Sequence, residues 1–160
     1  MELYLLRHGI AEDAAPGGSD SARALTSEGK EKLHRVLKRA AAAGASPSLI
    51  LSSPYRRAIE TAAIAADVLD YKGKVPRTEA LLPNASPYDA WEEIRARRDE
   101  DSILLASHEP LMSTLGAFLL HSPALAIDMK KAALLRIDCA AFGAEPRGTL
   151  KWMLTPALVS

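Results

Sequence analysis

The chain contains one cysteine, Cys139, in 160 residues. A single thiol excludes an internal disulfide and a metal cluster held by several cysteines. No charge of either sign is in excess, because Lys plus Arg and Asp plus Glu both number 20, and the formal net charge is zero. This balance argues against a nucleic-acid partner whose binding depends on neutralising backbone phosphates.

Long apolar runs are also missing. No stretch approaches the roughly 20 apolar residues that a membrane-spanning helix needs. The N-terminus lacks the basic lead and the extended apolar segment of a signal peptide. The hydrophobic and charged fractions, 48% and 25%, are ordinary for a globular protein. We therefore expect a cytoplasmic monomer without a membrane partner, folded as one domain over residues 1–160.

Short apolar runs alternate with helical patterns along the chain. The strands are predicted at residues 3–6, 49–51, 103–106, 133–137 and 149–154, with a further short strand within 75–82. The helices are predicted from Thr26 to Gly44, from Pro54 to about Leu69, from Pro87 and from Pro110. Continuous apolar strands separated by helices are typical of a buried, largely parallel sheet. The prediction is an α/β fold in three layers, mostly parallel, with the last two strands antiparallel near one edge.

Basic and imidazole side chains follow three of these strands. Arg7 and His8 end the first strand, Arg57 lies in the first turn of the helix after the second, and His108 ends the third. In an open parallel sheet the carboxyl ends of the strands share one edge, where ligands bind. A neutral imidazole can attack phosphorus, and a guanidinium can hold phosphate oxygens. The helix N-termini at Pro54 and Pro110 also favour an anion.

Each of these residues has an ordinary structural interpretation when it is taken alone. Arg7 and His8 could simply end a strand, Arg57 could be a solvated helix residue, and His108 could cap a helix. Their occurrence at three equivalent junctions favours a phosphate pocket instead. Arg56 is expected to be solvated, and we expect the remaining histidines, His34 and His121, to be non-catalytic.

Other phosphatase chemistries do not fit the sequence. A cysteine phosphatase needs an arginine six residues after its cysteine, and Glu145 stands there after Cys139. No predicted strand ends in Asp-x-Asp, which an aspartyl phosphotransferase requires. The acidic residues do not gather at strand ends as metallophosphatase ligands would.

Four segments carry a resemblance to a known family. They are Leu-Leu-Arg-His-Gly at residues 5–9, Arg-Ala-Leu-Thr-Ser-Glu-Gly at 23–29, Leu-Ser-Ser-Pro-Tyr-Arg-Arg-Ala-Ile-Glu-Thr at 51–61, and Leu-Leu-Ala-Ser-His-Glu-Pro at 104–110. In this order, and without a cap-sized insertion, the chain resembles the histidine phosphatase superfamily, which has the phosphoglycerate-mutase-like fold. Within it, the resemblance is greatest to the SixA-type phosphohistidine phosphatases.

The resemblance implies a role for each matching residue. His8 would be the nucleophile that forms a phosphohistidine intermediate, and Arg7, Arg57 and His108 would bind the phosphoryl group and stabilise its transition state. Arg23 matches a motif position on a loop near the site and would contribute to phosphate binding. This mechanism requires neither a metal nor a cofactor.

One departure from the family pattern bears on the substrate. Many mutase-like relatives place a glutamate general acid where this chain has Asn84, although Glu79 lies five residues upstream and could serve instead. An alkoxide leaving group benefits greatly from a proton donor. The P–N bond of phosphohistidine is more labile and its leaving imidazole is far less basic, so the loss of the acid favours phosphohistidine.

The predicted function is hydrolysis of phosphohistidine on a phosphorelay or phosphotransfer protein. A site without a cap would be shallow enough to admit a histidine on a protein surface, whereas small metabolites usually gain from an enclosing pocket. Two alternatives stay open. One is a phosphomonoesterase acting on a small metabolite or a phosphopeptide, and the other is a non-catalytic phosphate-binding module.

Overall fold

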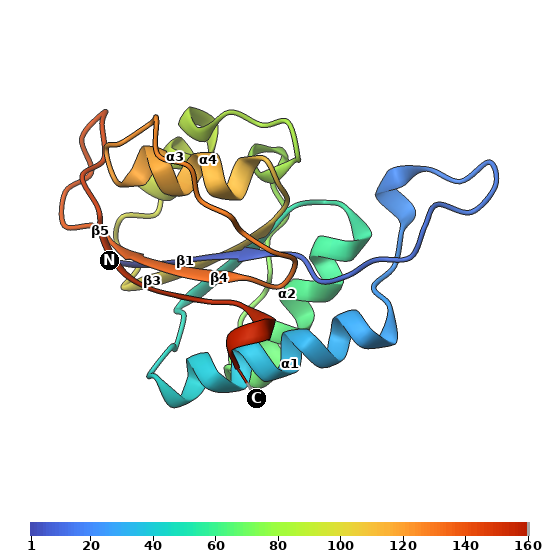
Figure 1. Cartoon of the computed structure of the whole chain (residues 1–160). Coiled ribbons are helices and arrows are strands. Elements are labelled where there is room, and N and C mark those ends of the chain that lie inside the picture. The colour runs from blue at the N-terminus through green and yellow to red at the C-terminus, as the bar shows by residue number, and fades with distance from the viewer. Residues whose placement is uncertain (160) are drawn as a thin grey trace.

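A five-stranded sheet forms the centre of the molecule in the computed structural model, which describes residues 1–159 (Figure 1). Its strand order is β2-β3-β1-β4-β5. The strands are β1 (Glu2–Arg7), β2 (Leu49–Ser52), β3 (Ser102–Ser107), β4 (Leu134–Asp138) and β5 (Thr149–Leu154). β3 pairs parallel with both β1 and β2, while β4 pairs antiparallel with β1 and with β5. The predicted α/β sheet, with its last two strands antiparallel at one edge, is confirmed.

Two pairs of helices cover the two faces of the sheet (Figure 1). The helices are α1 (Ser27–Ala42) and α2 (Arg56–Val68) on one face, and α3 (Pro87–Arg95) and α4 (Leu111–Leu119) on the other. The residues of β1 alternate between two cores: Leu3 and Leu5 pack with α3 and α4, and Tyr4 and Leu6 pack with α1 and α2. All four side chains are fully buried. A strand covered on both faces must be apolar throughout, which explains its continuous apolar run.

The starts of α1 and α3 agree with the sequence, and the start of α2 does not. Thr26 Oγ1 accepts a hydrogen bond from the Gly29 amide at 2.9 Å and caps α1, and Ser86 caps α3 in the same way. α2 begins at Arg56, two residues later than predicted, with Tyr55 in the capping position. Ser53 Oγ accepts a hydrogen bond from the Tyr55 amide at 3.2 Å and also lies 2.7 Å from His108 Nε2. Ser53 therefore holds the turn between β2 and α2 as well as His108.

The predicted short strand within residues 75–82 is wrong. One bridge pairs Arg77 with Ser52, and the chain then turns into a 3₁₀ helix, Glu79–Leu81. Thr78 ends the extended segment because its hydroxyl accepts a hydrogen bond from the Ala80 amide at 3.1 Å. Such local side-chain bonds compete with a strand ladder.

A long loop, residues 11–24, projects from the body of the molecule between β1 and α1 (Figure 1). A bridge between Ala11 and Leu25 and a hydrogen bond from the Glu12 amide to the Ala24 carbonyl close its base. A short 3₁₀ helix, Asp20–Ala22, lies near its end. Within residues 1–159, no helix has the length and apolar character needed to cross a membrane.

Candidate active site

The register of the parallel strands brings the predicted site residues to one edge. Arg7 at the end of β1 lies opposite Ser107 at the end of β3, and the His8 amide donates to the Ser107 carbonyl at 2.9 Å. His8 and His108 therefore follow two paired residues, and their rings meet edge to face with centroids 5.1 Å apart. β2 delivers Ser53 to the same edge through a hydrogen bond from its amide to the Ala106 carbonyl.

His8 has the tautomer and the charge of a nucleophile. Its Nδ1 lies 2.7 Å from the Gly9 carbonyl oxygen, which can only accept, so Nδ1 carries the proton and Nε2 keeps its lone pair. Burial lowers the pKa of His8 to about 4, and the positive charges of Arg57 and Arg7 act in the same direction. The imidazole is therefore neutral over the physiological pH range.

Arg57 lies in the first turn of α2, where all three of its guanidinium nitrogens donate hydrogen bonds. Nε donates to His8 Nε2 at 3.2 Å, Nη1 to the Asp20 carbonyl at 2.9 Å, and Nη2 to the Asp20 carboxylate at 3.1 Å. Its guanidinium carbon lies 5.1 Å from the centre of the Tyr55 ring, a cation–π contact. Arg57 thus contacts the atom of His8 that would attack phosphorus.

Thr61, one turn further along α2, connects Arg57 to the chain that follows His8. Its hydroxyl donates to the Arg57 carbonyl at 2.7 Å and accepts from the Gly9 amide at 3.2 Å. The side chain is fully buried, so both bonds form away from water. The position of α2 relative to the end of β1 is fixed by this hydroxyl as well as by apolar packing.

His108 is buried and only partly hydrogen-bonded. Its Nε2 lies 2.7 Å from Ser53 Oγ, and the Tyr55 ring packs edge-on against it. Its Nδ1 is buried without a partner among the described residues. Burial lowers the pKa of His108 to about 3, and the neighbouring His8 and Arg57 lower it further. His108 is consequently neutral at pH 7 and has a polar atom free for a ligand.

Arg7 also has a free buried donor. Its Nη1 donates to the Met129 carbonyl at 2.8 Å, while its Nε has no partner among the described residues. Burial lowers the pKa of Arg7 from its usual value. Because buried polar groups are nearly always hydrogen-bonded, Arg7 Nε and His108 Nδ1 are suited to oxygens of an anion bound beside His8.

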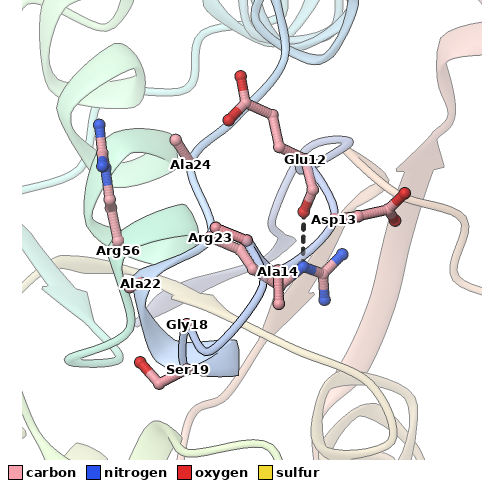
Figure 2. A pocket seen from close by; sticks show the side chains of 10 residues that line it. Glu12, Asp13, Ala14, Gly18, Ser19, Ala22, Arg23, Ala24 and Arg56 are labelled. Atoms are coloured by element: carbon pink, nitrogen blue, oxygen red, sulfur yellow. Dashed lines mark hydrogen bonds between the residues drawn. The ribbon is translucent and has the colours of Figure 1, made fainter.

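Arg23 and Arg56 lie further from the two histidines than Arg7 and Arg57 do. Arg23 donates from Nε to the Glu12 carbonyl at 2.6 Å and from Nη1 to the Asp20 carboxylate at 2.9 Å. It reaches Arg57 through Asp20 and makes no hydrogen bond to the histidines among residues 1–159. Figure 2 shows Arg23 turned toward the Glu12 backbone. Loop residues and Arg56 of α2 line a hollow of about 220 Å³ beside it. Arg56 is exposed and pairs with Glu60, as expected for a solvated helix residue.

The two candidates for a general acid lie on exposed positions. Glu79 and Asn84 belong to the segment that the Ser107 hydroxyl holds against the end of β3, through a 2.6 Å bond to the Leu81 carbonyl. Within the described residues, neither side chain hydrogen-bonds to Arg7, His8, Arg57 or His108. No group of three or more His, Cys, Asp or Glu side chains that could hold a metal ion occurs in residues 1–159.

Three residues with a place in this site were not identified from the sequence. Ser53 resembled a helix cap, and Thr61 was part of a motif without an assigned role. Asp20 lay in a loop rich in small residues. The Arg-x-x-x-Thr spacing in a helix, which puts both side chains on one face, could have indicated Thr61. Nothing local distinguishes Asp20, because its partner Arg57 is distant in the sequence.

Comparison with known proteins agrees with this geometry. The profile of the histidine phosphatase superfamily (branch 1) matches residues 3–81, which include Arg7, His8 and Arg57. An uncharacterized protein of Picosynechococcus sp. is 35% identical over 113 residues, covering 69% of this chain and 67% of the relative. The chain belongs to the histidine phosphatase superfamily.

Two solved structures indicate the branch of this superfamily. The protein histidine phosphatase SixA complexed with tungstate has a TM-score of 0.86 and 26% identity, over 98% of each chain. A protein from Agrobacterium tumefaciens that is named phosphohistidine phosphatase SixA has a TM-score of 0.79 and 27% identity, over 97% of this chain and 98% of that one. The predicted superfamily and its SixA-type branch are confirmed. The chain is a phosphatase of the histidine phosphatase superfamily.

Proposed function

We propose that this phosphatase hydrolyses phosphohistidine on a phosphotransfer protein through a covalent intermediate on His8. The proposal rests on the groups that surround His8 Nε2. This nitrogen has a lone pair on a neutral ring, and in the empty site the lone pair accepts a hydrogen bond from Arg57 Nε at 3.2 Å. Arg7 Nε and His108 Nδ1 remain as buried polar atoms without partners in the described residues.

In the first step, His8 Nε2 attacks the phosphorus of the substrate. A P–N bond forms to His8 while the P–N bond to the substrate imidazole breaks, and the departing ring nitrogen takes a proton from the solvent. Negative charge on the phosphoryl oxygens is balanced by Arg7 and Arg57, with His108 as a further hydrogen-bonding group. Phosphoryl transfer depends mainly on such positioning and electrostatic stabilisation.

In the second step, water attacks the phosphorus of phospho-His8. The P–N bond to His8 breaks, the water gives a proton to the solvent, and inorganic phosphate leaves with the neutral imidazole restored. The hydrogen bond from Nδ1 to the Gly9 carbonyl holds the ring in one orientation throughout both steps. Arg7, Arg57 and His108 would act on the same oxygens as in the first step.

The leaving group favours phosphohistidine over a phosphoester. Among residues 1–159, Asp20 is the one carboxylic acid that hydrogen-bonds to Arg7, His8, Arg57 or His108. The hydrogen bonds from Arg23 and Arg57 hold the pKa of Asp20 below its usual range. Asn84 stands where many relatives have a glutamate. A departing imidazole needs less protonation than an alkoxide, so a site without a strong acid suits it better. Both solved neighbours are named as SixA proteins.

The reaction can be tested with a phosphorylated histidine-containing phosphotransfer domain as the substrate. Wild-type protein should release inorganic phosphate with or without EDTA, and His8→Asn should reduce turnover by more than about 1000-fold. His34→Asn is the matched control, since His34 lies on α1 outside the site. Turnover that persists in the His8 variant would contradict the mechanism.

A panel of phosphoesters separates the alternatives. Rapid hydrolysis of small esters or phosphopeptides, with phosphohistidine left intact, would identify a phosphomonoesterase. Binding of phosphate without turnover of any phosphodonor would identify a non-catalytic phosphate-binding module.

A further inference from the structure

Asp20 connects the projecting loop to the site. Its carboxylate accepts from Arg57 Nη2 at 3.1 Å, and its backbone carbonyl accepts from Arg57 Nη1 at 2.9 Å. The other carboxylate oxygen accepts from Arg23 Nη1 at 2.9 Å. Asp20 is 57% exposed, whereas the Arg57 side chain is only 6% exposed. An accessible carboxylate of the loop thus forms an ion pair with a buried guanidinium.

This arrangement engages all three guanidinium nitrogens of Arg57, although Nη1 and Nη2 each keep a second N–H. Its third contact, from Nε to His8 Nε2, occupies the lone pair that must attack phosphorus. Phosphorus can reach the His8 lone pair only if Arg57 Nε moves off Nε2. Because the guanidinium is a rigid plane, this movement also shifts Nη1 and Nη2 relative to Asp20. Phosphoryl oxygens and carboxylate oxygens are both strong acceptors for a guanidinium, so they compete for the same donor.

We propose that Asp20 is an internal counter-ion that holds Arg57 in the empty site and is displaced from Nη2 by the phosphoryl oxygens of the substrate. The proposal rests on the proposed function, because it requires Arg57 to bind the phosphoryl group. Asp20 is then a positioning residue that acts through Arg57. When Arg57 turns to the phosphoryl group, the lone pair of His8 is released at the same time.

The loop is built so that this displacement leaves no charge unpaired. Asp20 keeps its second partner, Arg23, which is braced by the Glu12 carbonyl at the base of the loop (Figure 2). The exposed carboxylate can also be hydrated once it leaves Arg57. After hydrolysis, Asp20 competes with inorganic phosphate for Arg57. The competition lowers the affinity for the product and speeds its release.

Binding of inorganic phosphate and of tungstate provides the test. Asp20→Asn removes the competing charge, so it should bind both anions about tenfold more tightly than wild type, as calorimetry or inhibition of turnover would show. Asp13→Asn is the matched control. It removes the same charge from the same loop, and Asp13 has no ion pair within the described residues, so its affinity should change by less than about twofold. Unchanged or weaker binding by Asp20→Asn would overturn the proposal.

A crystal structure with tungstate gives a second measurement that does not depend on a variant. The proposal expects tungstate oxygens on Arg57 Nη2 and the Asp20 carboxylate moved off it, with Arg23 and Asp20 still paired. Tungstate bound to Arg57 with the Asp20 contact intact would contradict the counter-ion role and leave the phosphatase mechanism standing. Wild-type protein that binds neither anion would contradict both.

Discussion

His8 is held as a neutral base by its surroundings. Burial lowers its pKa to about 4, and the nearby guanidinium groups of Arg57 and Arg7 oppose a further positive charge. The same effects lower the pKa of His108 to about 3. A bound phosphoryl dianion reverses the balance, because a negative charge beside each ring favours the imidazolium form. The two histidines are therefore neutral before the substrate binds and more basic after it.

The titration of the two rings can be followed by NMR. In the free protein, the His8 and His108 resonances should not titrate between pH 8 and about 5, because both folded-state pKa values lie below this range. Tungstate should move both midpoints upward. His8→Asn and His108→Asn assign the signals. A midpoint near the ordinary value of 6.5 for either ring in the free protein would contradict the account.

Ser53 is expected to orient His108. Ser53→Ala removes the 2.7 Å contact to Nε2, leaves that nitrogen buried and unpaired, and also removes the acceptor of the Tyr55 amide. The free energy of unfolding should fall by about 1–2 kcal/mol, and turnover should fall by up to about 100-fold as His108 loses its orientation. Urea denaturation and phosphohistidine hydrolysis measure the two effects.

The NMR signal of His108 provides a readout that a purely structural role would not change. It should shift in Ser53→Ala and recover in part in Ser53→Thr. The control is Ser113→Ala, since the hydroxyl of the half-buried Ser113 bonds, among the described residues, only to the Pro110 carbonyl. Full activity in Ser53→Ala would show that the contact is dispensable.

At the scale of elements, the first turn of α1 packs against the chain that leaves the nucleophile. A Cβ added at Gly29 would lie 2.3 Å from the carbonyl oxygen of Ile10 and 2.8 Å from its amide nitrogen, both backbone atoms. The same turn is fixed by Thr26, whose hydroxyl accepts from the Gly29 amide. The helix can therefore approach the segment after His8 only because residue 29 has no side chain.

Gly29→Ala should consequently destabilise the fold and disturb the site. We expect a loss of about 1–3 kcal/mol in the free energy of unfolding, together with reduced turnover, because the clash is with backbone that cannot rotate away. Gly143→Ala is the matched control, since a Cβ there meets nothing within 4 Å. Equal stability of the two variants in urea denaturation would contradict this packing.

The elements differ in how far the sequence predicts them. β1 and β3 were predictable because strands buried on both faces are apolar throughout, and α1 and α3 because Thr26 and Ser86 are good caps. The segment containing Arg77 was misread as a strand because its turn depends on a hydroxyl bond local to Thr78. α2 starts two residues later than predicted because residues 54 and 55 form a bend, whose Tyr55 amide donates to Ser53 Oγ. The contact between Ser53 and His108 is tertiary, and no local pattern contains it.

The same distinction applies to the site residues. Arg7, His8, Arg57 and His108 could be proposed because parallel strands share one carboxyl edge, and the structure brings the four to that edge. The pairing of Asp20 with Arg57 could not be proposed. It depends on how a long loop folds back on a helix 37 residues away, which hydrophobic periodicity does not encode.

At the scale of the whole molecule, the two buried histidines make stability depend on pH. The folded-state pKa is about 4 for His8 and about 3 for His108, and both values lie below the ordinary 6.5. At pH values between these pKa values and 6.5, the unfolded chain therefore binds more protons than the folded protein. Their contribution is fully present above pH 6.5 and is lost as the pH falls toward 3. Urea denaturation across this range should show a decline of a few kcal/mol.

The histidine variants isolate this contribution. The decline should be shallower in the double variant His8→Asn, His108→Asn, which lacks both groups, than in the wild type. A third variant, His34→Asn, should decline as steeply as the wild type. Identical pH dependence in the wild type and the double variant would show that neither histidine titrates abnormally.

In the proposed mechanism, His8 carries the phosphoryl group during turnover. The most direct measurement mixes the protein with a phosphorylated phosphotransfer domain, quenches in alkali, where phosphohistidine survives, and locates the phosphoryl group by mass spectrometry. We expect one phosphoryl group on His8 in the wild type. The His8→Asn variant should carry none and should not hydrolyse the substrate. Phosphate release without phosphorylated His8, or with the phosphoryl group on another residue of the enzyme, would contradict this mechanism.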